Sequence, residues 1–219
     1  MKKKSITPFF VVIALMFVVS QVSFAQGMEG RLGLGARVSY MDYSDDDYTL
    51  YGVEVDVEPD EDVMYEGNLT YFIQDYFSIE LSVGYVETDV DLSALGLSGD
   101  AGDLESIPVL LSGRMHFSTN PKLNPYISFG VGYFFNDIDQ NDSTIEFIYG
   151  AGADLDVDDS FGFHLGAGVE FFISKNAAFN LDFKYIWTEV EAEVNKPGFT
   201  EEDLDINPYV LGLGIKYYF

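Results

Sequence analysis

Few side chains of this chain are suited to catalysis. The chain has two histidines, His116 and His164, and no cysteine. The missing cysteine excludes a disulfide framework, a thiolate metal site and a lipid-anchored N-terminal cysteine. Ser112 shares a strand face with His116, so a serine nucleophile acting on a lipid is one hypothesis. Such enzymes place serine, histidine and acid together within reach of a membrane lipid. A lone interior histidine more simply makes a structural hydrogen bond, and we expect no catalytic residue and no cofactor.

Acidic side chains concentrate in two short runs, at residues 45–47 and 154–159. Carboxylates at alternate positions suggest calcium, but an EF-hand loop needs glycine where Asp159 stands and glutamate where Leu165 stands. We expect no dedicated metal site. Loosely bound divalent cations and lipopolysaccharide are the expected partners, and the alternative is a solvated surface whose charges repel one another.

Strict alternation of large apolar residues with small or polar ones recurs along the chain and predicts β-strands. One face of these strands has 43 positions, of which 41 are apolar or aromatic and two are glycine. The opposite face holds nearly all of the strand glycines and every strand charge. The predicted strands are residues 31–40, 64–73, 77–86, 106–117, 126–135, 161–172, 178–187 and 208–219.

The sizes of the residues decide which face is inside. The interior of an eight-stranded barrel is barely wide enough for its own side chains. A face of 41 large residues does not fit there, whereas the glycine-rich face does. The large residues must therefore face lipid. The sequence predicts an all-β protein, an eight-stranded antiparallel transmembrane β-barrel.

The links between these strands alternate between short and long. The long links are residues 41–62, 87–105, 136–160 and 188–205, and they hold 31 of the 37 acidic residues. Outer-membrane barrels have short periplasmic turns and long extracellular loops. We therefore expect short periplasmic turns, four long acidic extracellular loops and both termini in the periplasm of a Gram-negative bacterium. The aromatic end of the last strand, Tyr217 and Phe219, is of the kind that the barrel-assembly machinery reads.

The first 25 residues have the pattern of a secretory signal peptide. Lysines at positions 2–4 precede the apolar run 9–19, and small residues stand at Ser23 and Ala25. The run is about half of the ~20 residues that a membrane helix needs, so we predict a signal peptide (residues 1–25) and a barrel domain (residues 26–219). The formal net charge of -26 argues against nucleic acid as a partner.

The inner face of the predicted barrel divides by height. Toward the short turns it carries nearly balanced charges, as expected where unpaired charge is costly. Toward the long links it becomes apolar. An apolar solute entering there could not pass through the charges and would leave sideways into the bilayer. The predicted conduit lining is Val86, Pro108, Leu110, Phe134, Ile186 and Val210. The predicted charge network is Arg31, Arg37, Glu66, Glu80, Arg114, His116, His164, Glu170, Asp182, Lys184 and Lys216.

Five stretches of the chain carry a resemblance to a known family: YFIQDYFSIELSVGY (71–85), IPVLLSGRMHF (107–117), NPYISFGVGYFF (124–135), FGFHLGAGVEFFISKNAAFNLDFKYI (161–186) and INPYVLGLGIKYYF (206–219). Together they resemble the OmpW family of outer-membrane barrels. The resemblance implies eight strands, an apolar lumen and passage of small hydrophobic molecules by lateral exit. The very acidic links depart from the family pattern.

Three functions remain open at this stage. The first is a conduit for small hydrophobic solutes. The second is a structural or adhesive barrel of the OmpA or OmpX kind, whose acidic loops bind cations, surfaces or protein partners. The third is a lipid-modifying enzyme. The interior features could also be packing alone, in a barrel that conducts nothing.

Overall fold

The computed structural model describes residues 27–43, 46–50, 53–59, 62–94, 97–117, 121–141, 144–146, 152–153, 155–194 and 202–219. The predicted signal peptide lies outside these residues and stays a prediction. No helix in the described ranges is long and apolar enough to span a membrane. The strands are β1 (Leu32–Asp42), β2 (Asp46–Leu50), β3 (Val53–Pro59), β4 (Asp62–Gln74), β5 (Phe77–Ala94), β6 (Leu97–His116), β7 (Leu123–Gln140), β8 (Leu155–Val157), β9 (Ser160–Phe172), β10 (Ala177–Val194), β11 (Glu202–Asp205) and β12 (Tyr209–Tyr218).

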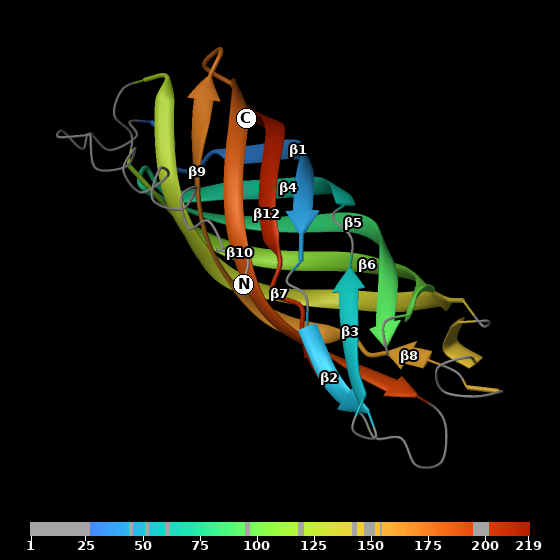
Figure 1. Ribbon diagram of the computed structural model, residues 1–219. Coiled ribbons are helices and arrows are strands. Elements are labelled where there is room, and N and C mark those ends of the chain that lie inside the picture. The colour runs from blue at the N-terminus through green and yellow to red at the C-terminus, as the bar shows by residue number, and fades with distance from the viewer. Residues whose placement is uncertain are drawn as a thin grey trace, which may run out of the picture.

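Eight of these strands form a closed antiparallel barrel. Their order is β1-β4-β5-β6-β7-β9-β10-β12, and β12 pairs with β1 to close the ring (Figure 1). At the closing seam Arg37 lies opposite Gly214 on β12, and on its other side opposite Glu66 on β4. The predicted eight-stranded antiparallel barrel is confirmed.

The two faces of the barrel wall are those that the alternation predicts. Large apolar side chains point outward: Leu213 is 68% exposed and Tyr65 is 63% exposed. Inward positions carry glycine where a long side chain crosses the interior. A Cβ at Gly35 would lie 2.6 Å from Asn68 Oδ1 and 2.7 Å from Lys216 Cγ. Small inward residues therefore make room for buried charges.

Several strands continue into the segments that alternation alone assigns to links. β5 extends to Ala94 and β6 begins at Leu97, so most of the expected link 87–105 is strand. The two-residue period persists there, with Thr88 and Val90 buried and Glu87, Asp89 and Asp91 exposed. The outer residues of these extensions are acidic, as suits a wall that rises above lipid into water.

The short strands mark one end of the barrel. β2 and β3 extend the sheet beside β5, and β8 and β11 pair with β10. Figure 1 shows β2, β3 and β8 together at the end opposite the C-terminus. We call this end the loop end. The opposite end, where the β4–β5 and β9–β10 connections lie, we call the turn end.

Arg31, which directly precedes β1, contacts the end of β12 and the β9–β10 connection at the turn end. Its guanidinium donates to the backbone oxygens of Tyr218 at 3.0 Å and Lys175 at 2.9 Å, and at 3.4 Å to that of Phe219. It therefore lies outside the interior charge network that the sequence predicts for it. The physical reason is its position: Arg31 precedes β1 and reaches around the rim rather than across the lumen.

We expect the substitution Arg31→Ala to loosen the seam between β1 and β12. Hydrogen bonds from a charged donor contribute about 1.5–3 kcal/mol each, less where exposed, so the free energy of unfolding should fall by about 1–3 kcal/mol. Urea unfolding in lipid vesicles measures it. Lys175→Ala, which keeps the accepting backbone oxygen, is the matched control, and an equal loss in both variants would contradict the role of the guanidinium.

Candidate functional site

The turn-side half of the interior holds eight buried charged residues. Four are basic and four acidic, so the group is electroneutral, and each is at most 5% exposed. We call them the charge network. Its members come from seven of the eight barrel strands: Arg37 (β1), Glu66 (β4), Glu80 (β5), Arg114 (β6), Glu170 (β9), Asp182 and Lys184 (β10), and Lys216 (β12).

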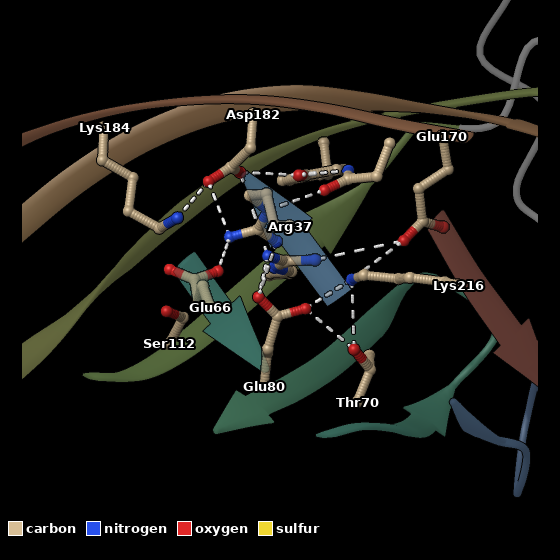
Figure 2. Close-up of polar contacts among 12 residues, drawn as sticks. Arg37, Glu66, Thr70, Glu80, Ser112, Glu170, Asp182, Lys184 and Lys216 are labelled. Atoms are coloured by element: carbon tan, nitrogen blue, oxygen red, sulfur yellow. Dashed lines mark hydrogen bonds and ion pairs between the residues drawn. The ribbon is translucent and has the colours of Figure 1, made fainter. Parts of the chain in front are cut away.

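Glu80 and Asp182 are the acids with the most partners in this network (Figure 2). Glu80 pairs with Arg37, at 3.1 Å from Nη2, and with Arg114 and Lys216. Asp182 pairs with Lys184, and with Arg37 Nη1 at 3.2 Å. Glu66 pairs with Arg37, which also pairs with Glu80 and Asp182, so the ion pairs share members. Removal of one member therefore affects several others.

Neutral hydrogen-bonding groups complete the network. Tyr126 donates to Asp182 at 2.6 Å, and its ring lies 4.5 Å from the Arg114 guanidinium carbon. Tyr218 donates to Glu170 at 2.6 Å, and Thr70 donates to Glu80 at 2.8 Å. Buried charges persist only when paired and hydrogen-bonded in this way. The turn-side half of the lumen thus holds a buried, charge-balanced set of side chains.

The two histidines lie beside this network, and each contacts a serine. His116 Nε2 is 2.8 Å from Ser78 Oγ, and His164 Nε2 is 3.2 Å from Ser112 Oγ. Within the described part of the chain, neither Nδ1 has a hydrogen-bond partner. A serine–histidine–acid set needs an acid on that nitrogen, and both histidines are buried away from lipid. The geometry gives no support to a lipid-modifying enzyme.

The loop-side half of the interior is apolar. Side chains from seven barrel strands meet there, and each is at most 7% exposed. Five of the six predicted lining residues belong to this group, and the sixth, Pro108, is buried beside Met64 near the inner side of Gly84. The group, which we call the apolar cluster, consists of Met41, Tyr43, Met64, Val86, Leu110, Phe134, Ile186 and Val210.

Three members of the apolar cluster were not predicted from the sequence. Met41 and Tyr43 fall in a segment assigned to a link, and Met64 stands at the first position of a predicted strand. Tyr43 closes the cluster at the loop end, where its hydroxyl accepts from Thr88 at 3.4 Å. Burial raises the pKa of the Tyr43 hydroxyl to about 12, so it stays neutral. The continuing alternation after Tyr40 is the signal that could have found Met41.

The barrel wall has a local interruption beside this cluster. β5 and β6 pair in one register on both sides, from Val83 opposite Val109 to Val86 opposite Ser106, but the pairing skips Gly84 and Tyr85. Pro108, which stands opposite Gly84, has no N–H to donate. Its pairing with Phe134 on β7 is intact, so the missing donor is the one that would face β5.

A family model described as the OmpW family matches residues 30–219, a range that includes every barrel strand. The chain belongs to the OmpW family. The resemblance seen in the strand sequences is therefore confirmed. The protein is an outer-membrane β-barrel, and the predicted location in the outer membrane is confirmed.

The relatives of this OmpW-family chain are outer-membrane proteins. Protein y4mB of Sinorhizobium fredii is 26% identical over 170 residues, which are 75% of this chain and 69% of that protein. Outer membrane protein AlkL of Ectopseudomonas oleovorans is 24% identical over 173 residues, with the same two shares. The crystal structure of OprG from Pseudomonas aeruginosa gives a TM-score of 0.77 at 22% identity and covers 90% of this chain and 99% of that one. The OprG likeness shows a shared fold.

The acidic rim of this OmpW-family barrel lies at the loop end. Asp158, Asp159, Glu189 and Glu191 are exposed around a surface pocket between β8, β9 and β10. Among the described residues, no group of three or more His, Cys, Asp or Glu side chains is placed to hold a metal ion. Loose binding of divalent cations and lipopolysaccharide stays a prediction.

Proposed function

We propose that this barrel passes small hydrophobic molecules across the outer membrane. A solute enters at the loop end, which faces the cell exterior, binds among the residues of the apolar cluster and leaves sideways into the bilayer. The observation that carries the proposal is the apolar cluster itself: seven strands direct apolar side chains into the loop-side half of a lumen that is charged below. Two of these side chains are methionines, which are unbranched and adapt readily to a ligand.

The charge network supports a sideways exit because it obstructs the direct route. An apolar solute that moved toward the turn end would have to separate buried ion pairs. Breaking a buried pair costs about 3–5 kcal/mol, and Glu80 alone holds three bases. A solute that moves from the apolar cluster directly into lipid meets no such barrier.

The interruption between β5 and β6 supports one place for that exit. Val86 and Leu110 of the apolar cluster flank it, on β5 and β6 respectively. A strand pair that lacks the hydrogen bond from position 108 separates there at lower cost than a continuous ladder. The exposed side chain of Tyr85 lies on the lipid side of the same gap.

The proposal also includes the orientation of the barrel in the membrane and its assembly signal. The loop end carries the acidic extensions and faces outward, so the turn end and both termini lie in the periplasm. Phe219 is 67% exposed at the turn end, which suits a residue read by the barrel-assembly machinery.

We expect Leu110→Arg and Val210→Arg each to slow uptake of a hydrophobic solute by cells about tenfold. A guanidinium without a partner holds water in the apolar cluster, and an apolar solute then binds there less favourably. The initial uptake rate of labelled n-octane measures the effect. Asp137→Arg, which adds an arginine at an exposed loop-end position, is the control. Heat-dependent gel mobility verifies that each variant is folded.

Unchanged uptake in both folded variants would contradict the conduit. It would favour a structural or adhesive barrel, whose function should instead depend on the acidic segments 41–62 and 136–160.

A further inference from the structure

The layer of the lumen directly below the apolar cluster is neither apolar nor fully charged. On each strand that contributes to the cluster, the next inward residue toward the turn end is a serine, a glycine or a charged residue of the network. His164, from the remaining strand, stands opposite Ile186 and Gly130 at this height. In the order of the strands, these residues are Ser39, Glu66, Gly84, Ser112, Gly132, Lys184 and Gly212.

Three neutral polar side chains of this layer, Ser39, Ser112 and His164, form what we call the polar floor. They are 1%, 1% and 3% exposed. Among the described residues, Ser39 Oγ and His164 Nδ1 have no hydrogen-bond partner. A Cβ at Gly212 would lie 2.5 Å from Ser39 Oγ and 2.4 Å from Arg37 Cδ, so only glycine at this position lets both side chains lie where they do. Buried polar atoms without partners are costly, so a ligand oxygen that reaches these two atoms from the apolar cluster directly above them gains a hydrogen bond there.

The charges beside and below the polar floor exclude an ionised ligand. Glu66 and Lys184 lie in the same layer, and each already has a partner, Arg37 and Asp182 respectively. The network is electroneutral. A carboxylate or ammonium group would add an unbalanced charge in a setting of low dielectric, and this is far more costly than burying a neutral polar group.

We infer that the preferred solute is a neutral amphiphile with an apolar tail and a single hydroxyl or carbonyl oxygen. The tail contacts the apolar cluster, and the oxygen hydrogen-bonds to the polar floor, through Ser39 Oγ on one wall or the Ser112–His164 pair on the other. A bare hydrocarbon leaves those atoms without partners, and a carboxylate disturbs the charge balance below. The inference rests on the proposed function and specifies its substrate class.

The test compares three solutes that share an eight-carbon skeleton: 1-octanol, n-octane and octanoate. Initial uptake rates are measured in a Gram-negative host that makes no barrel of this family, with and without this protein, and the rate without it is subtracted. The octanol-to-octane ratio should exceed one and fall about fivefold in Ser39→Ala/Ser112→Ala, which is the change expected for one net hydrogen bond. Octanoate should show no barrel-dependent uptake.

Ser128→Ala is the matched control. Ser128 is also a buried serine whose Oγ has no partner among the described residues, but it stands opposite Arg114, within the charge network. Its removal should leave the octanol-to-octane ratio unchanged. A second measurement avoids transport: octanol titrated into the protein in lipid nanodiscs should shift the backbone amide signals of Ser39 and Ser112 more than that of Ser128.

The outcomes separate the inference from the proposed function. Equal ratios in the wild type and Ser39→Ala/Ser112→Ala, or barrel-dependent uptake of octanoate, would overturn the substrate class while the conduit stands. No barrel-dependent uptake of either octanol or octane would overturn both. Amide shifts centred on Ser128 would place the oxygen in the charge network and would also overturn the inference.

Discussion

A disulfide between positions 85 and 107 should stop solute release while leaving the barrel folded. Tyr85 and Ile107 stand opposite each other across the interrupted stretch of β5 and β6, and both point outward. Directly opposed residues of antiparallel strands have Cβ atoms ~4.5–5.5 Å apart, close to disulfide geometry. In Tyr85→Cys/Ile107→Cys the oxidised form ties the two strands together. If the exit is here, uptake should fall about tenfold or more, because an opening step gates it.

The natural chain has no cysteine, so no other thiol of the chain competes with the two introduced ones. Uptake is measured before and after reduction of the same sample, and reduction should restore it. Val131→Cys/Phe163→Cys is the matched control, because these outward residues also stand opposite each other, on the continuous pair β7 and β9. Equal inhibition by both disulfides, or none by either, would contradict an exit between β5 and β6.

The fold was predictable from the sequence because the membrane imposes a simple rule on each strand. Lipid demands apolar residues at every outward position, and a narrow lumen demands small or polar ones at every inward position. The two-residue period therefore identifies each strand, and which of its residues point outward, from the sequence of that strand alone. The outward part of this rule fails above the membrane, where the outward residues are acidic, although Thr88 and Val90 are still buried on the inner face. For this reason the alternation of apolar residues does not predict the extensions to Ala94 and Gln140.

The interior site was predictable in its composition but not in its pairing. Which residues point inward, and at what height, follows from one strand at a time. Which serine meets which histidine depends on the register between strands. Thus Ser112 lies on the strand of His116 but contacts His164, and His116 contacts Ser78. Arg31 was misplaced for a related reason, since the turn at the rim decides whether its side chain points across the lumen or along the seam.

Because Arg31 lies outside the lumen, the buried charges of the lumen balance. Without it the lumen holds four bases and four acids, and the whole set is buried. A balanced set permits charges in a low-dielectric space because each acid offsets a neighbouring base. The balance also predicts that removal of one acid together with one base destabilises the barrel less than removal of a single charged residue.

Glu80→Ala should be the most destabilising single substitution in the lumen. Glu80 pairs with Arg37, Arg114 and Lys216, and it accepts a hydrogen bond from Thr70. Its removal leaves a net positive charge among groups that are at most 2% exposed. Loss of one partner of a buried pair typically costs about 3–5 kcal/mol, and here three bases lose the same acid. The free energy of unfolding, from urea titrations in lipid vesicles, measures the loss.

The decisive comparison is Glu80→Met/Lys216→Met, which removes one acid and one base and keeps the network neutral. Replacement of buried pairs by apolar residues of similar size is often close to neutral, so this variant should recover most of the stability lost in Glu80→Ala. Glu66→Met/Lys216→Met is the matched control for side-chain volume: it is also neutral overall but leaves Glu80, with its remaining arginines, in place. If Glu80→Met/Lys216→Met is as unstable as Glu80→Ala, individual contacts rather than charge balance hold the lumen together, and the barrier to direct passage must be attributed to packing.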